Sequence, residues 1–328
     1  MQWAKGTSAV SVLERATRNL RKVPGVFLAL LGLMAIFGAL GEGFFTLYNL
    51  VNICKQGSIL VIVAMGTTLA ILTAGIDLST GSVLTLSGVT VGLAIHNGLP
   101  IPLAILMALL VGCLCGGLNG YLIAYLRFHH FIATFGMMGI AQGIALAVTQ
   151  GAVVPGFEPA FRLLGDGTFL GIPAPVLAAA AVVSCTGIAL YRTRWGAHVY
   201  AVGGSEQVAA WAGIDTRKVK MLVYLLSGLF AATAGVILTA RMNSASPIAG
   251  MGYEFDAIAA VIIGGTPFEG GRGGIVGTVI GAAVISTLKN GLNILGLPTP
   301  WQITIIGLMI TVAIVVDVLY EHRKDRSL

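Results

Sequence analysis

Charged side chains are the scarcest feature of this 328-residue chain, which has 19 Lys and Arg and 13 Asp and Glu residues. Charged residues make up 10% of the chain, against about 25% in soluble domains. So few charges cannot cover the surface of a soluble globule of this length. A disordered chain needs the opposite balance, with low hydrophobicity and high charge. The sequence therefore excludes both an ordinary soluble protein and an intrinsically disordered one.

Cysteine is also rare, with only Cys54, Cys113, Cys115 and Cys185. Four cysteines in a chain of this length exclude a small disulfide-stapled secreted module. None of them forms a C-x-x-C pair, and all four lie in apolar segments. We therefore expect buried thiols with a packing role rather than metal or redox sites.

Motifs for chemistry are absent as well. None of the seven lysines is followed by Ser or Thr, so the chain lacks a P-loop, and any ATP-driven activity needs a separate ATPase subunit. There is no G-x-S-x-G motif. His129 and His130 adjoin Arg127 without a third ligand at suitable spacing, so we expect a solvated loop there. The sequence predicts no catalytic residue, no metal site and no cofactor in this chain.

Long apolar runs dominate what is present: 56% of the residues are hydrophobic and the mean hydropathy is +0.92. A bilayer core of about 30 Å takes about 20 helical residues, whereas outer-membrane barrels show short alternating segments. The sequence predicts an all-α polytopic membrane protein. The expected spans are Pro24 to Gly41, Val51 to Ala74, Val83 to Ile95, Pro102 to Leu126, Phe131 to Gln150, Pro173 to Tyr191, Met221 to Ala240, Gly274 to Leu292 and Trp301 to Val316.

A shorter run, Ala257 to Gly264, decides whether there are nine or ten spans, because it is too short to cross alone unless Tyr253 to Asp256 are included. Basic residues at both ends of the chain indicate cytoplasmic termini, which requires an even number of spans. Ten spans place 15 of the 19 Lys and Arg residues on the cytoplasmic side. The net charge of +6 is thus an orientation signal rather than a sign of nucleic-acid binding.

The remaining segments predict a single transmembrane domain over residues 1–328. Ser11 to Glu14 fits a capping box, so we expect a cytoplasmic interfacial helix within residues 1–23; the alternative is an unstructured basic tail. No cleavage site of a signal peptide follows it. The longest cytoplasmic loop covers residues 192–220.

Small residues recur every fourth position in two spans, which lets helix backbones approach closely in lipid. We expect two helix-packing faces of this kind. They consist of Gly112, Gly116 and Gly120 in one span, and Gly273, Gly277 and Gly281 in another. The two spans would run in opposite directions, which hints at an inverted repeat.

Polar residues within the apolar runs are candidates for a translocation path or gate. Asp77 lies in Gly75 to Ser82, where its carboxylate either caps the next helix or takes part in gating. We interpret Glu254 as an exterior charge and Lys289 as a residue that snorkels to the interface. Interhelical hydrogen bonding is the alternative role for the uncharged candidates. The candidate path residues are Asp77, Ser79, Ser82, Thr134, Gln142, Asp256, Asn290 and Asn293.

A short helix is predicted in the cytoplasmic loop, with Ser205 as its N-cap and Gly213 as the glycine after its end. A helix of about two turns is marginal alone in water. It is either a decorative loop helix or one that docks in a groove on a partner. The residues of this loop that such docking would involve are Gly203, Gly204, Ser205, Glu206, Ala209, Ala210 and Gly213.

Together these segments resemble the permease subunits of bacterial ABC importers for ribose and related simple sugars. Gly75 to Ser82 resembles the family's G-I-D-L-S-x-G-S motif, and Phe131 to Met138 its F-I-A-T-L-x-M-M segment. Gly203 to Ile214 resembles its cytoplasmic loop, with Ser205 where Asn is usual, which implies that the loop residues named above couple this chain to the ATPase. Tyr253 to Thr266 is similar to another family stretch, as is the tract of residues 270–281. The turn of residues 267–269 departs from the usual small polar sequence.

The resemblance implies a permease that imports a monosaccharide of the ribose type across the bacterial inner membrane. It implies three partners besides membrane lipid, and no nucleic acid. They are a P-loop ATPase subunit that binds ATP and Mg, a periplasmic sugar-binding protein, and a second permease that is a copy or a homologue. The alternatives are another cargo, such as an autoinducer-type furanose, a nucleoside or a branched-chain amino acid, and an ion-coupled secondary transporter.

Overall fold

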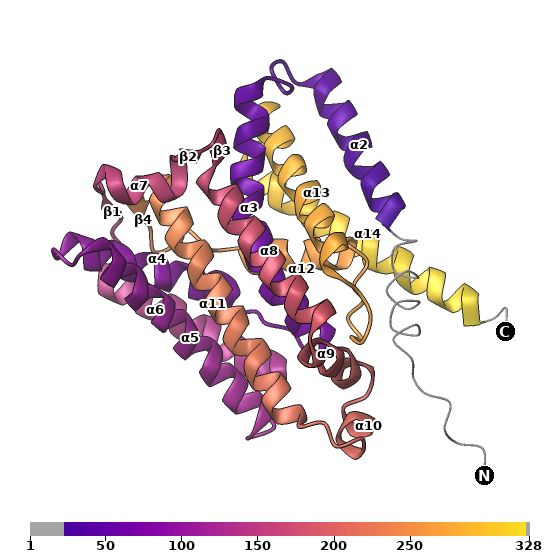
Figure 1. Cartoon of the computed structure of the whole chain (residues 1–328). Coiled ribbons are helices and arrows are strands. Elements are labelled where there is room, and N and C mark those ends of the chain that lie inside the picture. Colours follow the sequence, from indigo (N-terminus) through magenta and orange to yellow (C-terminus); the bar gives the residue numbers. More distant parts are fainter. Residues whose placement is uncertain (1–22, 326–328) are drawn as a thin grey trace, which may run out of the picture.

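The computed structural model describes residues 23–325, which fold into an all-α bundle (Figure 1). The interfacial helix and capping box expected before residue 23 lie outside the described residues. The long helices are α2 (Val23–Leu40), α3 (Leu47–Leu72), α4 (Thr80–His96), α5 (Ile101–Ala124), α6 (His130–Thr149), α8 (Ala174–Arg192), α11 (Thr216–Met242), α13 (Ile275–Ile294) and α14 (Thr299–Asp325). Shorter helices are α7 (Pro159–Asp166), α9 (Arg194–Gly204), α10 (Glu206–Trp211) and α12 (Tyr253–Ile263).

Six of these helices, namely α3, α5, α6, α8, α11 and α13, are long and apolar enough to cross a membrane. Two shorter apolar helices accompany them, Gly25–Leu40 and Thr80–His96. The predicted multi-pass helical fold is therefore confirmed. Each expected span overlaps one helix of the structure. However, α12 has only 11 residues, which is about 16 Å of helix and about half of a hydrocarbon core.

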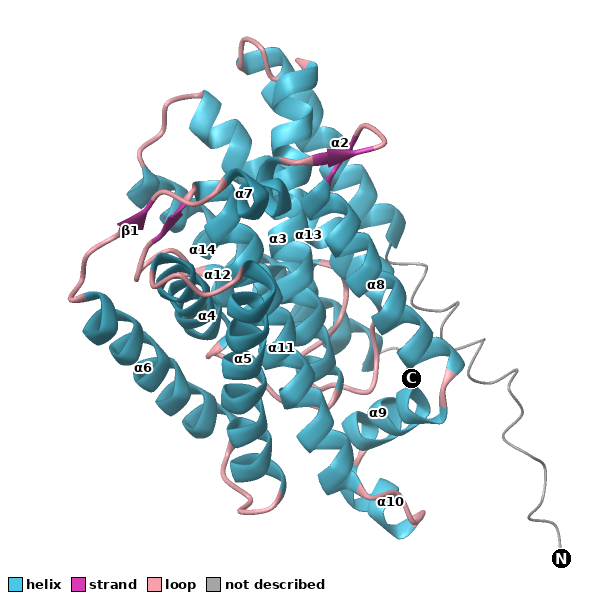
Figure 2. Ribbon diagram, turned by 60° about the vertical axis from the view of Figure 1, so that its left-hand side comes forward, coloured by secondary structure: helices cyan, strands magenta, loops and turns pink. Residues whose placement is uncertain are grey.

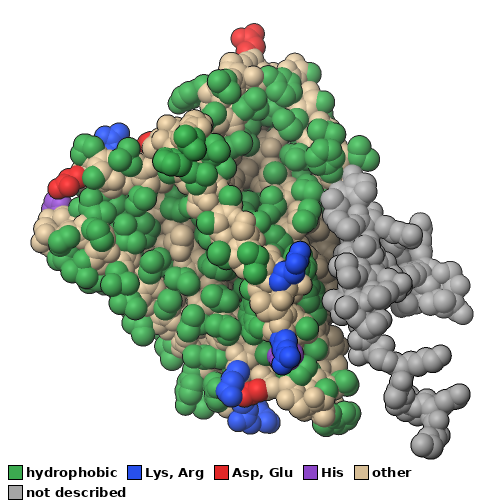
Figure 3. Space-filling view, viewed as in Figure 1, with side chains coloured by type: hydrophobic (Ala, Val, Ile, Leu, Met, Phe, Trp, Pro, Cys, Tyr) green, Lys and Arg blue, Asp and Glu red, His purple; other side chains and the backbone are tan. Residues whose placement is uncertain are grey.

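Helix α3 forms the centre of the bundle, because every residue from Gly57 to Leu72 is buried. Helices α8, α11, α12 and α13 pack around it, and Figure 2 shows α3, α11 and α13 in the middle with α6 at the edge. The outer helices expose apolar side chains, which cover most of the face in Figure 3. This arrangement is the one expected when lipid, not water, surrounds the helices.

The same arrangement overturns the expectation of buried cysteines. Cys54 and Cys185 are exposed, and Cys113 and Cys115 are half-buried. The expectation assumed that an apolar segment lies in the protein interior. A helix in a membrane protein also presents apolar side chains to lipid, so a thiol in an apolar run is not thereby buried.

Helices α5 and α11 meet through glycine, as the spacing of Gly112, Gly116 and Gly120 predicts. A Cβ atom added at Gly116 would lie 2.3 Å from the Tyr224 carbonyl oxygen, and one at Gly112 would lie 2.4 Å from the Ala232 Cβ. Only glycine permits this approach of two backbones. The close contact fixes α11 between α5 and the central α3.

The second glycine face is shorter than expected. A Cβ at Gly277 would lie 1.9 Å from the Gly264 carbonyl oxygen, and one at Gly281 would lie 2.0 Å from that of Ala260, so these two glycines do pack α13 against α12. The prediction that Gly273 shares their helical face is wrong. Gly273 precedes α13 and has φ +124, which no helical residue adopts.

The segment between α6 and α8 carries more structure than its Pro- and Gly-rich turns indicate. It contains α7, and two-residue strands β1 (Val154–Pro155), β2 (Thr168–Phe169) and β3 (Ile172–Pro173). Strand β1 pairs antiparallel with β4 (Ser244–Ala245), and β2 pairs with β3. The first pair joins this segment to the chain that follows α11.

Candidate functional site

The short helix predicted within residues 192–220 is α10, and both of its predicted ends are confirmed. Ser205 is its N-cap, with the hydroxyl oxygen accepting a hydrogen bond of 3.3 Å from the Val208 amide. At the other end the Gly213 amide donates to the Ala210 carbonyl and the Ile214 amide to that of Ala209. Gly213 has φ +83. This pair of bonds is a Schellman motif, which requires a left-handed residue after the helix.

One ion pair holds α10 against α11, and a second lies within the first turn of α11. The Lys220 Nζ atom lies 2.5 Å from Glu206 Oε2. Asp215 caps α11, with its carboxylate accepting from the Lys218 amide at 3.2 Å and lying 3.1 Å from Lys218 Nζ. The hydrogen bond from the Lys218 amide is the main cause that lowers the pKa of Asp215 below its ordinary value. The cap is therefore ionised at neutral pH.

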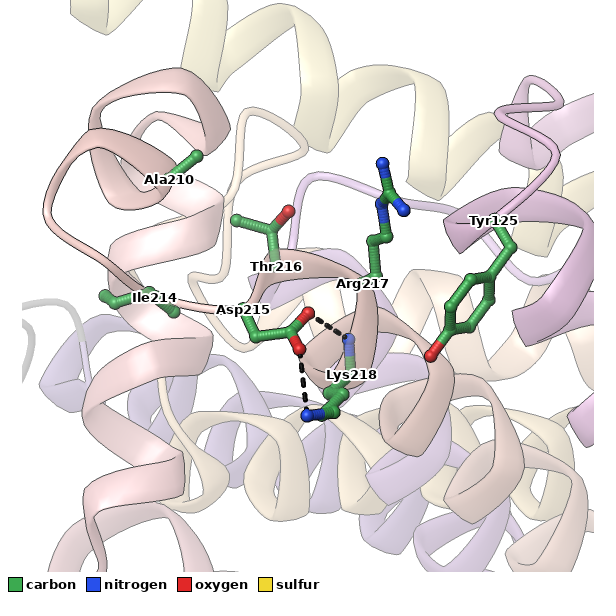
Figure 4. A pocket seen from close by; sticks show the side chains of 7 residues that line it. All are labelled: Tyr125, Ala210, Ile214, Asp215, Thr216, Arg217 and Lys218. Carbon is green, nitrogen blue, oxygen red and sulfur yellow. Dashed lines mark hydrogen bonds and ion pairs between the residues drawn. The ribbon is translucent and has the colours of Figure 1, made fainter.

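The outer face of α10 is apolar and unpaired within the described chain. Val208 is 57% exposed and Trp211 is 76% exposed, whereas Ala209 is buried beneath them. A pocket of about 400 Å³ lies between Ala210 of α10, the start of α11 and Tyr125 after α5 (Figure 4). Figure 4 shows Arg217 and Tyr125 on the side of the pocket opposite Ala210 and Ile214. In Figure 3 several Lys and Arg side chains gather at this end of the molecule.

The loop is also joined directly to the centre of the bundle. A Cβ atom at Gly203, the penultimate residue of α9, would lie 1.8 Å from the Leu72 carbonyl oxygen and 2.5 Å from the Gly271 amide nitrogen. The Gly271 amide itself donates to the Leu72 carbonyl at 3.0 Å. The end of α3, the loop before α13 and the end of α9 thus meet at one point. By contrast, a Cβ at Gly204 would have no atom within 4 Å.

Asp77 lies at a second polar centre, where the chain passes from α3 into α4. Its carboxylate accepts from the Ser79 amide at 3.0 Å, the Ser79 hydroxyl at 2.6 Å and the Ser227 hydroxyl at 2.7 Å. The Asn119 side-chain amide donates to the Ser79 hydroxyl at 2.9 Å. All four side chains are buried. The carboxylate therefore connects the start of α4 to α11 and, through Ser79, to α5.

The first turn of α6 holds the same crossing segment. The Ile76 amide donates to His130 Nδ1 at 3.2 Å, and the Thr134 hydroxyl lies 3.3 Å from the Ile76 carbonyl oxygen. The expectation of a solvated loop at His129 and His130 is therefore wrong for His130. This ring is half-buried because it receives a backbone hydrogen bond that the polar sequence around it did not indicate.

The other predicted path residues lie apart from Asp77. The Gln142 side-chain amide donates to the Pro247 carbonyl at 2.7 Å. Asn290 exchanges side-chain hydrogen bonds of 2.9 and 3.0 Å with Asn49 of α3. Ser82 is buried, and Asn293 is exposed. The structure thus brings Asp77, Ser79 and Thr134 to one segment but does not gather all eight residues.

Asp256 has a charged partner that the sequence reasoning missed. Its carboxylate forms an ion pair with Lys289 of α13, whose Nζ atom lies 5.9 Å from the centroid of the Tyr253 ring. The interpretation of Lys289 as a snorkelling residue is wrong, because the ammonium group turns to this buried carboxylate. The sequence feature that could have indicated this pair was the presence of two opposite charges in neighbouring apolar segments. Within residues 23–325, no three His, Cys, Asp or Glu side chains form a group that could hold a metal.

Comparison with known proteins places this geometry in context. Residues 49–314 match the family described as "Branched-chain amino acid transport system / permease component". The chain is 43% identical over 295 residues to the ribose import permease protein RbsC of Bacillus subtilis, covering 89% of this chain and 92% of that protein. It is 41% identical over 295 residues to the D-allose transport system permease protein AlsC of Escherichia coli, covering 89% and 90%.

A more distant relative is the fructose import permease protein FrcC of Rhizobium meliloti, which is 36% identical over 327 residues. That similarity covers 94% of this chain and 89% of the relative. No solved structure matches the chain.

Proposed function

Because the chain belongs to the family of branched-chain amino acid transport system permease components, we propose that it translocates a monosaccharide of the ribose type. It is a permease subunit of an ABC importer and not an enzyme, since ATP is hydrolysed on a separate subunit of such importers. In this proposal a periplasmic binding protein delivers the sugar to the exterior mouth. ATP and Mg bind to the partner ATPase and not to this chain.

The observation that supports a sugar as the cargo is the sequence identity of 41–43% to ribose and allose permeases, over about nine-tenths of the chain. The family description names branched-chain amino acids. Its members have diverged in cargo, so relatives with substantial identity are the better guide. A furanose signal, a nucleoside, a branched-chain amino acid and ion-coupled transport are not favoured by these relatives.

We propose a topology of ten spans in the bacterial inner membrane, with both termini in the cytoplasm. The bias of Lys and Arg toward one side supports it. Helix α12 is then one of the ten, although it is shorter than the bilayer core. The glycine faces of α5 and α13, the fourth and ninth of the ten spans, support an inverted repeat, because each would be the fourth helix of its half.

The loop of residues 192–220 is the proposed coupling element. Exposed Val208 and Trp211 on α10 would enter a groove of the ATPase. Movement of α10 would reach the bundle through Gly203, which contacts the backbone at Leu72 and Gly271. The proposed coupling residues are those predicted from the sequence, from Gly203 to Gly213. Gly203, Ser205 and Gly213 shape the loop, and Glu206 ties it to α11.

The proposed path or gating residues are likewise those of the sequence prediction. For Asp77 the hydrogen bonds to Ser79 and Ser227 support a capping role that also joins α4 to α11. A change of state that separates these helices would break these bonds. For Asp256 the ion pair with Lys289 supports a gate between α12 and α13. A second permease, identical or homologous, would complete the assembly.

Purification of the tagged chain from its native membranes tests the class of transporter. We expect a P-loop ATPase to copurify in stoichiometric amount, and ATP-dependent uptake of radiolabelled D-ribose after reconstitution with that ATPase and the binding protein. Uptake by the permease alone that an ionophore abolishes would instead establish an ion-coupled carrier. Competition by unlabelled allose, fructose, nucleosides and amino acids defines the cargo.

A further inference from the structure

Two helices begin inside the protein, and their N-terminal ends meet. Helix α4 begins at Thr80 after the crossing from α3, and α12 begins at Tyr253 after a segment that runs inward along α4. Ala245 packs against Gly92, whereas the Gly250 amide donates to the Thr85 hydroxyl at 2.9 Å, about two turns nearer the start of α4. The ends touch at Gly81, where an added Cβ would lie 2.5 Å from the Gly250 carbonyl oxygen.

Polar groups at this junction lack partners. Glu254 is 7% exposed, and its Oε1 atom accepts from the Gly252 amide at 3.3 Å, but its Oε2 atom has no hydrogen bond within the described chain. That Oε2 atom lies against α4, only 1.9 Å from where a Cβ of Gly81 would stand. The hydroxyl of Thr80, which is 1% exposed, also has no partner among residues 23–325. Leaving such groups unpaired costs about 1–3 kcal/mol each.

Helix geometry adds unused donors at the same point. The first amides of any α-helix have no acceptor within the helix. Ser79, the N-cap of α4, makes no side-chain capping bond. The Asp77 carboxylate takes the Ser79 amide, which leaves those of Gly81 and Ser82 without an acceptor among the described residues. The junction therefore combines two amide donors, one hydroxyl and one carboxylate acceptor.

This set of groups selects the chemistry of a ligand. An anion would meet the Glu254 carboxylate, and a cation would meet the amide donors and the positive ends of two helix dipoles. Asp256 is already paired with Lys289, so it adds no second free carboxylate. A hydroxyl both donates and accepts. Adjacent hydroxyls of a neutral sugar can thus donate hydrogen bonds to Glu254 Oε2 and accept hydrogen bonds from the amides.

We propose that the junction of α4 and α12 is a binding site for adjacent hydroxyls of the sugar as it passes through the permease. Glu254 Oε2 accepts, and the amides of Gly81 and Ser82 with the Thr80 hydroxyl complete the site. Gly252 beside the site is half-buried, and the neighbouring Met251 is exposed. This inference rests on the proposed function, and it adds Glu254 and Thr80, which the predicted path residues did not include.

Binding of D-ribose to the full-length permease in lipid nanodiscs tests the site, with saturation-transfer NMR as the readout because it detects weak ligands. We expect Glu254→Gln and Thr80→Val each to raise the Kd for D-ribose about tenfold, as the loss of one buried hydrogen bond predicts. The matched controls are Glu269→Gln and Thr304→Val, which change an exposed acid and an exposed threonine and should leave the Kd unchanged. Equal unfolding temperatures of the four variants exclude a folding defect.

The preference for one sugar over another distinguishes a role of Glu254 in sugar binding from a purely structural role. The wild-type permease should bind 2-deoxy-D-ribose more weakly than D-ribose, and Glu254→Gln should narrow that difference. No binding by the wild type, or equal Kd values in Glu254→Gln and Glu269→Gln, would overturn the inference. The proposed function fails separately, if no ATPase copurifies and no ATP-dependent uptake occurs. Normal uptake with unchanged Kd values in the variants would thus reject the site alone.

Discussion

Lys220 of α11 and Glu206 of α10 are joined by an ion pair of 2.5 Å, across a loop of 13 intervening residues. The pair fixes the angle between the exposed helix α10 and the long helix that runs beside α3. A rigid joint at this place converts a movement of α10 into a movement of α11. In the proposed coupling role, the loop would therefore act as a lever and not only as a docking segment.

Charge reversal at this joint should uncouple the transporter. Glu206→Lys places two cations together, so α10 no longer moves with α11. The pair is partly exposed, and such pairs contribute less than about 1 kcal/mol to stability. We expect assembly and ATPase activity to persist while sugar uptake falls several-fold, measured in the same proteoliposomes. The reciprocal variant Glu206→Lys with Lys220→Glu should restore uptake; if it does not, the ion pair is not the joint.

Removal of the Asp77 carboxylate should destabilise the bundle. Asp77→Ala leaves the buried hydroxyls of Ser79 and Ser227 without their acceptor, at about 1–3 kcal/mol for each unpaired group. Thermal unfolding in detergent measures this loss. In a double-mutant cycle Ser227→Ala should have a smaller effect in the Asp77→Ala background than in the wild type. Additive effects would show that the 2.7 Å bond between them contributes no coupling.

Two adjacent glycines of α5 offer a matched test of helix packing. Gly116→Ala places a methyl group 2.3 Å from the Tyr224 carbonyl oxygen, whereas Gly117→Ala meets only the Met221 side chain at 3.9 Å. Overpacking of this kind costs about 1–3 kcal/mol. We expect a lower unfolding temperature for Gly116→Ala alone. Equal unfolding temperatures of the two variants would contradict the close contact between α5 and α11.

Removing one charge of the ion pair between Asp256 and Lys289 should lower the stability of the protein more than removing both charges. Lys289→Met leaves a buried carboxylate unpaired, which costs about 3–5 kcal/mol. Lys289→Met combined with Asp256→Leu removes the unpaired charge, so we expect partial recovery of the unfolding temperature. Sugar uptake should stay low in the double variant if the pair also acts as a gate. Full uptake would assign the pair to structure alone.

The cap of α11 gives a pH dependence with a defined sign. The pKa of Asp215 is lowered from 3.8, so its stabilising effect is present above that value. The effect disappears as the pH falls through the lower pKa of the folded protein. Deuterium exchange at the Lys218 amide, corrected for its intrinsic pH dependence, should therefore accelerate only in strongly acidic buffer. Asp215→Asn should remove this transition, and an unchanged profile would refute the assignment.

Local signals explain why the ends of α10 could be predicted. An N-cap serine and a left-handed glycine form hydrogen bonds with backbone groups within four residues. The roles of Ser205 and Gly213 can therefore be predicted from the neighbouring sequence alone. The glycine face of α5 is also local, because its four-residue spacing follows from helix geometry. The same four-residue spacing gave a wrong prediction at Gly273. Glycines can repeat every four residues in the sequence even where the first of them lies before the start of the helix.

Partners could not be predicted, because they depend on tertiary packing. Lys289 and Asp256 are 33 positions apart, and Asn49 and Asn290 are 241 positions apart. Asp256, Lys289 and Asn290 were each visible as polar groups in or beside an apolar run, whereas Asn49 lies just before one. Nothing in the spacing says which pairs with which. Glu254 was misjudged for a similar reason: its place before a short apolar run suggested an exterior charge, whereas the inward course of residues 246–252 buries it.

The length of α12 determines what holds it in place. A full span is fixed in height by the two membrane surfaces, where its polar ends must reach water. Helix α12 reaches only about half that distance, so neither surface positions it. Its depth is set instead by its register on α13, where the backbones at Gly264 and Ala260 rest on Gly277 and Gly281. Sliding of α12 along this glycine face would therefore move Glu254 along α4 and would break the ion pair between Asp256 and Lys289.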